Sequence, residues 1–249
     1  MRRRRVAEDE RPLALGPGGR PLHPVGALFE AAFRRLGQAF GAYMLYTIVC
    51  GLPLAVVAWI VVARDVEGFG LFLALALAWS LGHLTLVGIL AGLVTGGLRE
   101  RAGSIAIAVV IGAVVLSVPA ALLPPLALIP YPFVVLGPVA AASGDAHGAG
   151  AVVAGAKLAG RHIGRSALVV FGLVTVSLFV WFGFVIALSP VDPTLRKAGS
   201  FAIVTLIVWP VAALVARNLY GDLPGRLVIR DAPGEGDRQA DLERRGRRR

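Results

Sequence analysis

Residues 70–94 read GLFLALALAWSLGHLTLVGILAGLV and contain no Asp, Glu, Lys or Arg. A helix of roughly 20 apolar residues is long enough to cross the hydrocarbon core of a bilayer. The apolar residues of this stretch cover all faces of such a helix and do not form a single stripe, which is typical of a helix surrounded by lipid or by other helices. Residues 70–94 therefore predict a transmembrane helix.

Five further apolar stretches, also without Asp, Glu, Lys or Arg, accompany it: 41–63, 104–123, 126–142, 167–188 and 200–216. The fold class that follows is an all-α integral membrane protein with six transmembrane helices. The fourth and sixth stretches are short, and the fourth contains Pro130, Pro132 and Pro138. Because prolines at membrane depth leave carbonyl groups that neighbours must satisfy, five helices plus a re-entrant or kinked fourth segment is the leading alternative.

The composition places the bulk of the chain in lipid and its charge outside. Of 249 residues 57% are hydrophobic, and the formal net charge of +10 is concentrated in arginine runs at positions 2–5 and 244–249. We predict disordered tails over 1–24 and 221–249 and a membrane domain over 25–220. Acidic residues interrupt the C-terminal arginines, so nucleic acid is not an expected partner.

The distribution of basic residues predicts the orientation, because short loops rich in Lys and Arg stay in the cytoplasm. If the N-terminus is cytoplasmic, the inner connections carry more basic residues (Arg99, Arg101, Lys157, Arg161 and Arg165) than the outer ones (Arg64, Arg196 and Lys197). We therefore expect a multi-pass protein of the cell membrane with both termini in the cytoplasm.

Two stretches outside the predicted spans have the pattern of amphipathic helices on the cytoplasmic side. In residues 25–40, VGALFEAAFRRLGQAF, the apolar side chains share one face, opposite Arg34 and Arg35. In residues 143–166 the basic side chains recur every four residues as Lys157, Arg161 and Arg165. Both stretches predict interfacial helices whose five basic residues bind anionic lipid headgroups; the alternative is that these residues only enforce topology.

Few residues in the apolar stretches carry chemistry. His83 is the one histidine among them and is a candidate intramembrane polar site, as a ligand or proton relay; the alternative is a neutral histidine bonded to a neighbouring helix. Asp145 and His147 are a weaker candidate for acid–base or metal chemistry. The single cysteine, Cys50, excludes an intrachain disulfide, and we expect no cofactor, metal centre or enzymatic activity.

Four segments carry a resemblance to a known family: RPLHPVGALFEAAFRRLGQAF (20–40), PYPFVVLGPVAA (130–141), AGAKLAGRHIGRS (154–166) and WPVAALVARNLYGDLPGR (209–226). The chain resembles the poorly characterised bacterial, actinobacterial-type six-helix proteins related to the membrane domain of glycerophosphoryl diester phosphodiesterase. The matching positions are Pro21 and Leu22, Pro132 and Pro138, Arg165 and Ser166, and Tyr220, Asp222 and Leu223. The resemblance implies the membrane fold and not the hydrolase activity, because the phosphodiesterase domain itself is absent from this sequence.

These observations favour a non-catalytic membrane component that organises lipids or partner proteins, with membrane lipids and membrane proteins as the expected partners. The alternative is a small transporter or channel subunit, since discontinuous helices often shape substrate sites. A polar cavity that reaches His83 or Pro130 would favour the transporter. Uniformly apolar packing at these residues would count against it.

Overall fold

The computed structural model describes residues 22–64, 68–190 and 193–223, and within these ranges every regular element is helical. The elements are α1 (Val25–Gln38), α2 (Phe40–Arg64), α3 (Phe69–Thr95), α4 (Leu98–Leu122), the 3-10 helix η2 (Pro124–Leu128), α5 (Tyr131–Val134), α6 (Leu136–Ser143), α7 (Ala149–Arg161), α8 (Ile163–Ala187) and α9 (Pro193–Asp222). In the described part of the chain, five helices (α2, α3, α4, α8 and α9) are long and apolar enough to cross a membrane. An all-α chain with apolar helices of this length is therefore confirmed. Most of the two predicted tails, residues 1–21 and 224–249, lies outside the described residues.

Helix α3 is the centre of the bundle and packs against α2, α4, α6 and α9. Small residues allow these close approaches: a Cβ atom on Gly82 would lie 2.4 Å from the backbone oxygen of Cys50 in α2. On α4, a Cβ atom on Gly112 would lie 2.7 Å from a methyl group of Val134 and 2.8 Å from one of Leu84. Glycines at such positions let helix backbones approach each other in a membrane. Close packing at these glycines therefore fixes the position of α3, in addition to the burial of its apolar side chains.

The fourth apolar stretch is broken into η2, α5 and α6. Helix α4 stops at Leu122 because Leu123 is extended (φ −158°, ψ 114°), as a residue before proline tends to be, and Pro124 and Pro125 follow. The chain then bends again at Pro130, whose carbonyl accepts a hydrogen bond from the amide of Val134 at 3.1 Å. Of the three prolines noted in the sequence, Pro130 lies at a break, whereas Pro132 and Pro138 lie inside α5 and α6, and the break between these two helices is at Val135.

The two predicted amphipathic stretches both contain helices, α1 and α7. Helix α1 packs mainly against α9, and its buried residues are Leu28, Ala32 and Leu36. The buried face of α7 packs against α5 and α6. The stretch 143–166, predicted as one helix, is divided at His162 (φ −123°, ψ 39°), so Arg165 belongs to the first turn of α8 and not to α7.

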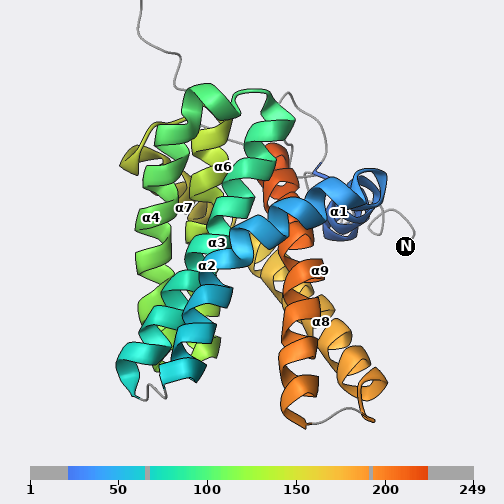
Figure 1. Cartoon of the computed structure of the whole chain (residues 1–249). Helices are drawn as coiled ribbons and strands as arrows, with labels where there is room; N and C mark the ends of the chain where they lie inside the picture. Colours follow the sequence, from blue (N-terminus) through green and yellow to red (C-terminus); the bar gives the residue numbers. More distant parts are fainter. Residues whose placement is uncertain (1–21, 65–67, 191–192, 224–249) are drawn as a thin grey trace, which may run out of the picture.

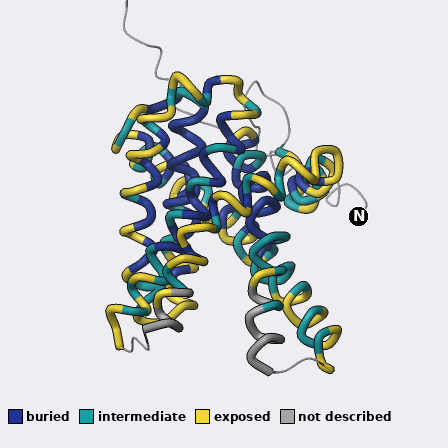
Figure 2. The backbone as a smooth tube through the Cα atoms, in the orientation of Figure 1, coloured by how far each residue is buried: buried dark blue, intermediate teal, exposed yellow. Residues whose placement is uncertain are grey.

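The helices form two arms that meet at one end and separate towards the other (Figure 1). One arm contains α2, α3 and α4 with α6 and α7, and the second contains α8 and α9. We call the end where α3 and α9 finish the closed end, and the end where α2 and α8 finish the open end. Buried residues are concentrated towards the closed end, whereas the arms are largely exposed towards the open end (Figure 2).

Candidate functional site: an apolar cleft with a polar inner end

A cleft lies between the two arms in the half of the molecule nearer the open end. Its volume is about 940 Å³, within the range of about 300–1,000 Å³ that is common for sites of small organic ligands. Helices α2 and α3 line one side, α8 and α9 line the other, and η2 with Tyr131 of α5 completes the wall. The lining runs along α3 from Phe72 to His83, a length of about 16 Å at 1.5 Å per residue.

The walls of the cleft are apolar. They consist mainly of alanine, leucine and valine side chains with aromatic rings, for example Ala55, Leu75, Val174 and Leu206. Among the residues that line the cleft there is no Asp, Glu, Lys or Arg. An apolar cavity of this kind binds hydrocarbon and excludes ions, because a charge moved into a low-dielectric site costs several kcal/mol unless it is paired.

Histidine and aromatic rings form the inner end of the cleft. The His83 side chain is only 2% exposed, and its Nε2 atom lies 2.8 Å from the hydroxyl oxygen of Tyr131. The imidazole is nearly parallel to the rings of Trp79 (centroids 5.5 Å apart) and Tyr131 (5.7 Å), and it meets Trp209 edge to face at 5.6 Å. Three segments of the chain, α3, α5 and α9, therefore fix the position of His83.

The second nitrogen of the imidazole is buried and unused: His83 Nδ1 has no hydrogen-bond partner among the described residues. A buried polar atom without a partner costs about 1–3 kcal/mol. Such an atom in a native structure calls for an explanation, for example a bound molecule. His83 is thus bonded to a neighbouring segment, as the simpler interpretation predicted, and also has one nitrogen left over at a cavity.

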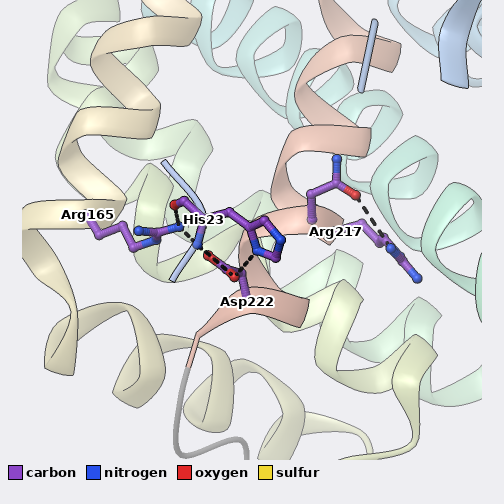
Figure 3. A network of polar contacts seen from close by, with 5 residues as sticks. His23, Arg165, Arg217 and Asp222 are labelled. Atoms are coloured by element: carbon purple, nitrogen blue, oxygen red, sulfur yellow. Dashed lines mark hydrogen bonds and ion pairs between the residues drawn. The ribbon is translucent and has the colours of Figure 1, made fainter. Parts of the chain in front are cut away.

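A second polar group lies at the closed end, where three distant segments meet (Figure 3). Asp222, at the end of α9, pairs with the guanidinium of Arg165 and accepts a hydrogen bond from the His23 backbone amide at 3.3 Å. The His23 ring nitrogen Nδ1 also lies 2.8 Å from this carboxylate, and Arg165 donates to the His23 backbone oxygen. One carboxylate therefore connects the segment before α1 with α8 and α9.

Asp145 and His147 lie in the loop between α6 and α7. The Asp145 carboxylate accepts a hydrogen bond of 2.9 Å from the hydroxyl of Tyr220, and both groups are buried. His147 is exposed in the same loop. Asp145 thus connects the loop after α6 to α9.

The five basic residues predicted to bind lipid headgroups are in different environments. Lys157 and Arg161 are exposed on α7. On α1, Arg34 is exposed and pairs with Glu30 at 2.6 Å, while Arg35 is half-buried and its Nη1 atom has no partner among the described residues. Arg165 is largely buried against Asp222. Helix α1 packs on α9 and α7 packs on α5 and α6, so the two helices cover different parts of the bundle.

Comparisons with protein-family models, with curated proteins and with solved structures found no match to this chain.

Sequence reasoning identified His83 but not the residues that surround it. Tyr131 lies 48 residues from His83 along the chain, is 8% exposed and is bonded to His83 inside the bundle. Trp79 and Trp209 were also missed as neighbours of the imidazole. Trp79 precedes His83 by four residues, the spacing at which helical side chains meet, so this one contact could have been predicted.

Proposed function

We propose that this chain is a non-catalytic lipid-binding component of the cell membrane, and that the cleft between its arms holds the hydrocarbon part of a lipid. The observation that carries the proposal is the cleft itself: about 940 Å³ with apolar walls. In a bilayer such a space fills with hydrocarbon, because neither water nor ions are stable on apolar walls.

The proposal includes six membrane crossings, the fourth of which is the broken segment η2–α5–α6. It begins directly after the end of α4 at the open end. It finishes beside the other end of α4, where the Ala142 carbonyl accepts hydrogen bonds from Arg101 at 2.8 Å and from Thr95 at 3.0 Å. A segment that passes from one end of α4 to the other covers the same depth of membrane as that helix.

Both termini and the closed end are proposed to face the cytoplasm, on the basis of the basic residues in the short connections. In this orientation α1 and α7 lie on the cytoplasmic side, and the cleft occupies the outer part of the hydrocarbon core. Its length of about 16 Å is roughly half of the 30 Å core. Lys157 and Arg161, exposed on α7, are then placed to interact with anionic headgroups of the inner leaflet.

The proposed relationship to the membrane domain of glycerophosphoryl diester phosphodiesterase rests on motif positions alone. Arg165 and Asp222 are two of these positions, and they form an ion pair. A shared structural role for them supports the proposal, because it gives a physical reason for both residue types to occur together.

The lipid-binding proposal is tested with two tryptophan substitutions on neighbouring residues of α2. Ala55→Trp would fill the cleft, because Ala55 lines it. Val56→Trp is the matched control, because Val56 is 53% exposed and is not part of the lining. Native mass spectrometry of protein purified in mild detergent should show retained lipid in the wild type and in Val56→Trp and its loss in Ala55→Trp. Equal lipid retention by both variants would contradict the proposal.

A transporter for an apolar molecule is the second candidate. The specific observation in its favour is that the broken segment lines the cleft through Pro124 and Tyr131, as discontinuous helices do at transport sites. The apolar walls argue against a polar solute or an ion as substrate. Lipid exchange between proteoliposomes and acceptor vesicles separates the two candidates: a binding component does not accelerate the exchange, whereas a transporter does.

A further inference from the structure

One hydrogen-bond donor at the inner end of the cleft has no acceptor among the described residues. A neutral imidazole carries one N–H group and a phenol carries one O–H group, whereas His83 and Tyr131 share a single hydrogen bond of 2.8 Å. If Tyr131 donates to Nε2, the N–H group of His83 is at Nδ1, which has no partner among the described residues. If Nε2 donates to Tyr131, the Tyr131 hydroxyl hydrogen is left without an acceptor. Either tautomer leaves one donor for an acceptor atom that the described chain does not supply.

Both side chains line the cleft. The Nδ1 atom is itself buried in this structure, so a molecule in the cleft supplies the acceptor when a side chain at the inner end shifts to admit its oxygen. The atom has to be uncharged, because the lining contains no Lys or Arg to pair with an anion. The acceptor is therefore an oxygen of a hydroxyl or carbonyl group. The rings of Trp79 and Trp209 beside His83 provide a flat apolar surface next to it.

The remainder of the bound molecule has to be apolar and elongated. The walls beyond His83 are formed mainly by alkyl and aromatic side chains over about 16 Å along α3. A phospholipid would place its charged headgroup at the membrane surface, which leaves the inner donor without an acceptor. A molecule with one uncharged polar end satisfies both the donor and the walls.

We propose that the cleft binds an uncharged lipid with a single hydroxyl or carbonyl head, inserted head first so that its oxygen accepts a hydrogen bond from the His83–Tyr131 pair. The inference rests on the proposed lipid-binding function and adds to it the class of ligand and its direction. It also assigns to His83 the role of selecting the ligand head.

The test compares hexadecan-1-ol with hexadecane, two probes with the same chain that differ by one oxygen. Equilibrium binding of each radiolabelled probe is measured on the full-length protein in detergent micelles, with hexadecyl sulfate as a charged third probe. One net hydrogen bond predicts that the wild type binds the alcohol about fivefold more tightly than the alkane. The sulfate should bind more weakly than the alcohol.

Two variants show whether the preference comes from the inner end. The double variant His83→Phe with Tyr131→Phe keeps both aromatic rings and removes every donor of the pair, so the ratio of alcohol to alkane affinity should fall to about one while hexadecane still binds. Thr47→Val is the matched control, because Thr47 also lines the cleft but its hydroxyl donates to the Tyr43 backbone oxygen at 2.7 Å. This variant should keep the wild-type ratio.

The outcomes separate this inference from the proposed function. Equal affinity of the wild type for alcohol and alkane, an unchanged ratio in the double variant, or tighter binding of the sulfate would overturn the inference and leave lipid binding intact. Failure of both neutral probes to bind would overturn both, and a stable dimer on light scattering would then identify a second copy as the occupant. If the double variant does not fold, the wild-type ratio decides the proposal by itself.

Discussion

Arg165 and Asp222 form an ion pair between the first turn of α8 and the last residue of α9, with side chains that are 16% and 8% exposed. The segment before α1 joins the same carboxylate through His23. The pair lies at the closed end, where the two arms meet. We infer that it helps to hold together the end of the molecule from which the arms diverge.

Removing one member of this pair should destabilise the protein strongly. Asp222→Asn leaves the Arg165 guanidinium largely buried without its counter-ion, and breaking a buried pair typically costs about 3–5 kcal/mol. We expect the midpoint of thermal unfolding in detergent to fall by several degrees. Glu30→Gln is the control, because it removes a carboxylate from the exposed pair with Arg34, and exposed pairs contribute little.

A double-mutant cycle shows whether the effect comes from the pair. Arg165→Gln combined with Asp222→Asn should be less destabilising than the sum of the two single variants, because neither charge is then left alone. Strict additivity would show that the two residues act independently and that the ion pair does not contribute to stability.

A substitution at the contact between α6 and α7 should also be costly. A Cβ atom on Gly155 would lie 2.6 Å from the backbone nitrogen of Gly137 and 2.7 Å from the carbonyl carbon of Leu136. Because these are backbone atoms, the helices must move apart, and overpacking of this kind costs about 1–3 kcal/mol. Gly155→Ala should therefore lower the midpoint of thermal unfolding.

Gly150 provides the matched control on the same helix, since a Cβ atom there has no neighbour within 4 Å. Gly150→Ala should leave the midpoint unchanged or raise it slightly, because alanine favours the helix. If the two alanine variants were equally stable, α7 would not be packed against α6 in the way the structure shows.

The exposed basic residues of α7 should give the protein a preference for anionic lipid. Each Lys or Arg near an anionic surface contributes on the order of 1 kcal/mol. Changing Lys157 and Arg161 to Gln together should therefore reduce the preference for phosphatidylglycerol over phosphatidylcholine, measured by competition in native mass spectrometry. Unfolding midpoints should not move, because both side chains are exposed. An unchanged lipid preference would leave these residues with a role in topology only.

Local composition was enough to predict the long helices but not the contacts between them. Apolar stretches without charge specify α2, α3, α4, α8 and α9. The prolines of the fourth stretch indicated that it is broken, although only Pro130 of the three lies at a break. The partners of His83 and Arg165 lie 48 and 57 residues away along the chain, and no periodicity within one helix reports such a distance.

The cleft itself was not predictable for a related reason. Ala55 lines the cleft and its neighbour Val56 does not, although both belong to the same uninterrupted apolar run of α2. In a membrane, side chains that face lipid and side chains that face a cavity are both apolar, so the amphipathic pattern that separates core from surface in water is lost. Only the arrangement of the two arms distinguishes them.

The number of crossings is the last prediction, and it follows from which residues must share a side of the membrane. The Arg101 guanidinium bonds to the Ala142 backbone oxygen at 2.8 Å, so Arg99 and Ala149 are expected on one side. Pro125, at the far end of α4, is expected on the other. In a background with Cys50→Ser, a membrane-impermeant thiol reagent applied to intact cells should label Pro125→Cys. It should label Arg99→Cys and Ala149→Cys only after permeabilisation. A re-entrant fourth segment would instead expose Pro125→Cys and Ala149→Cys on the same side, and that pattern would rule out six crossings.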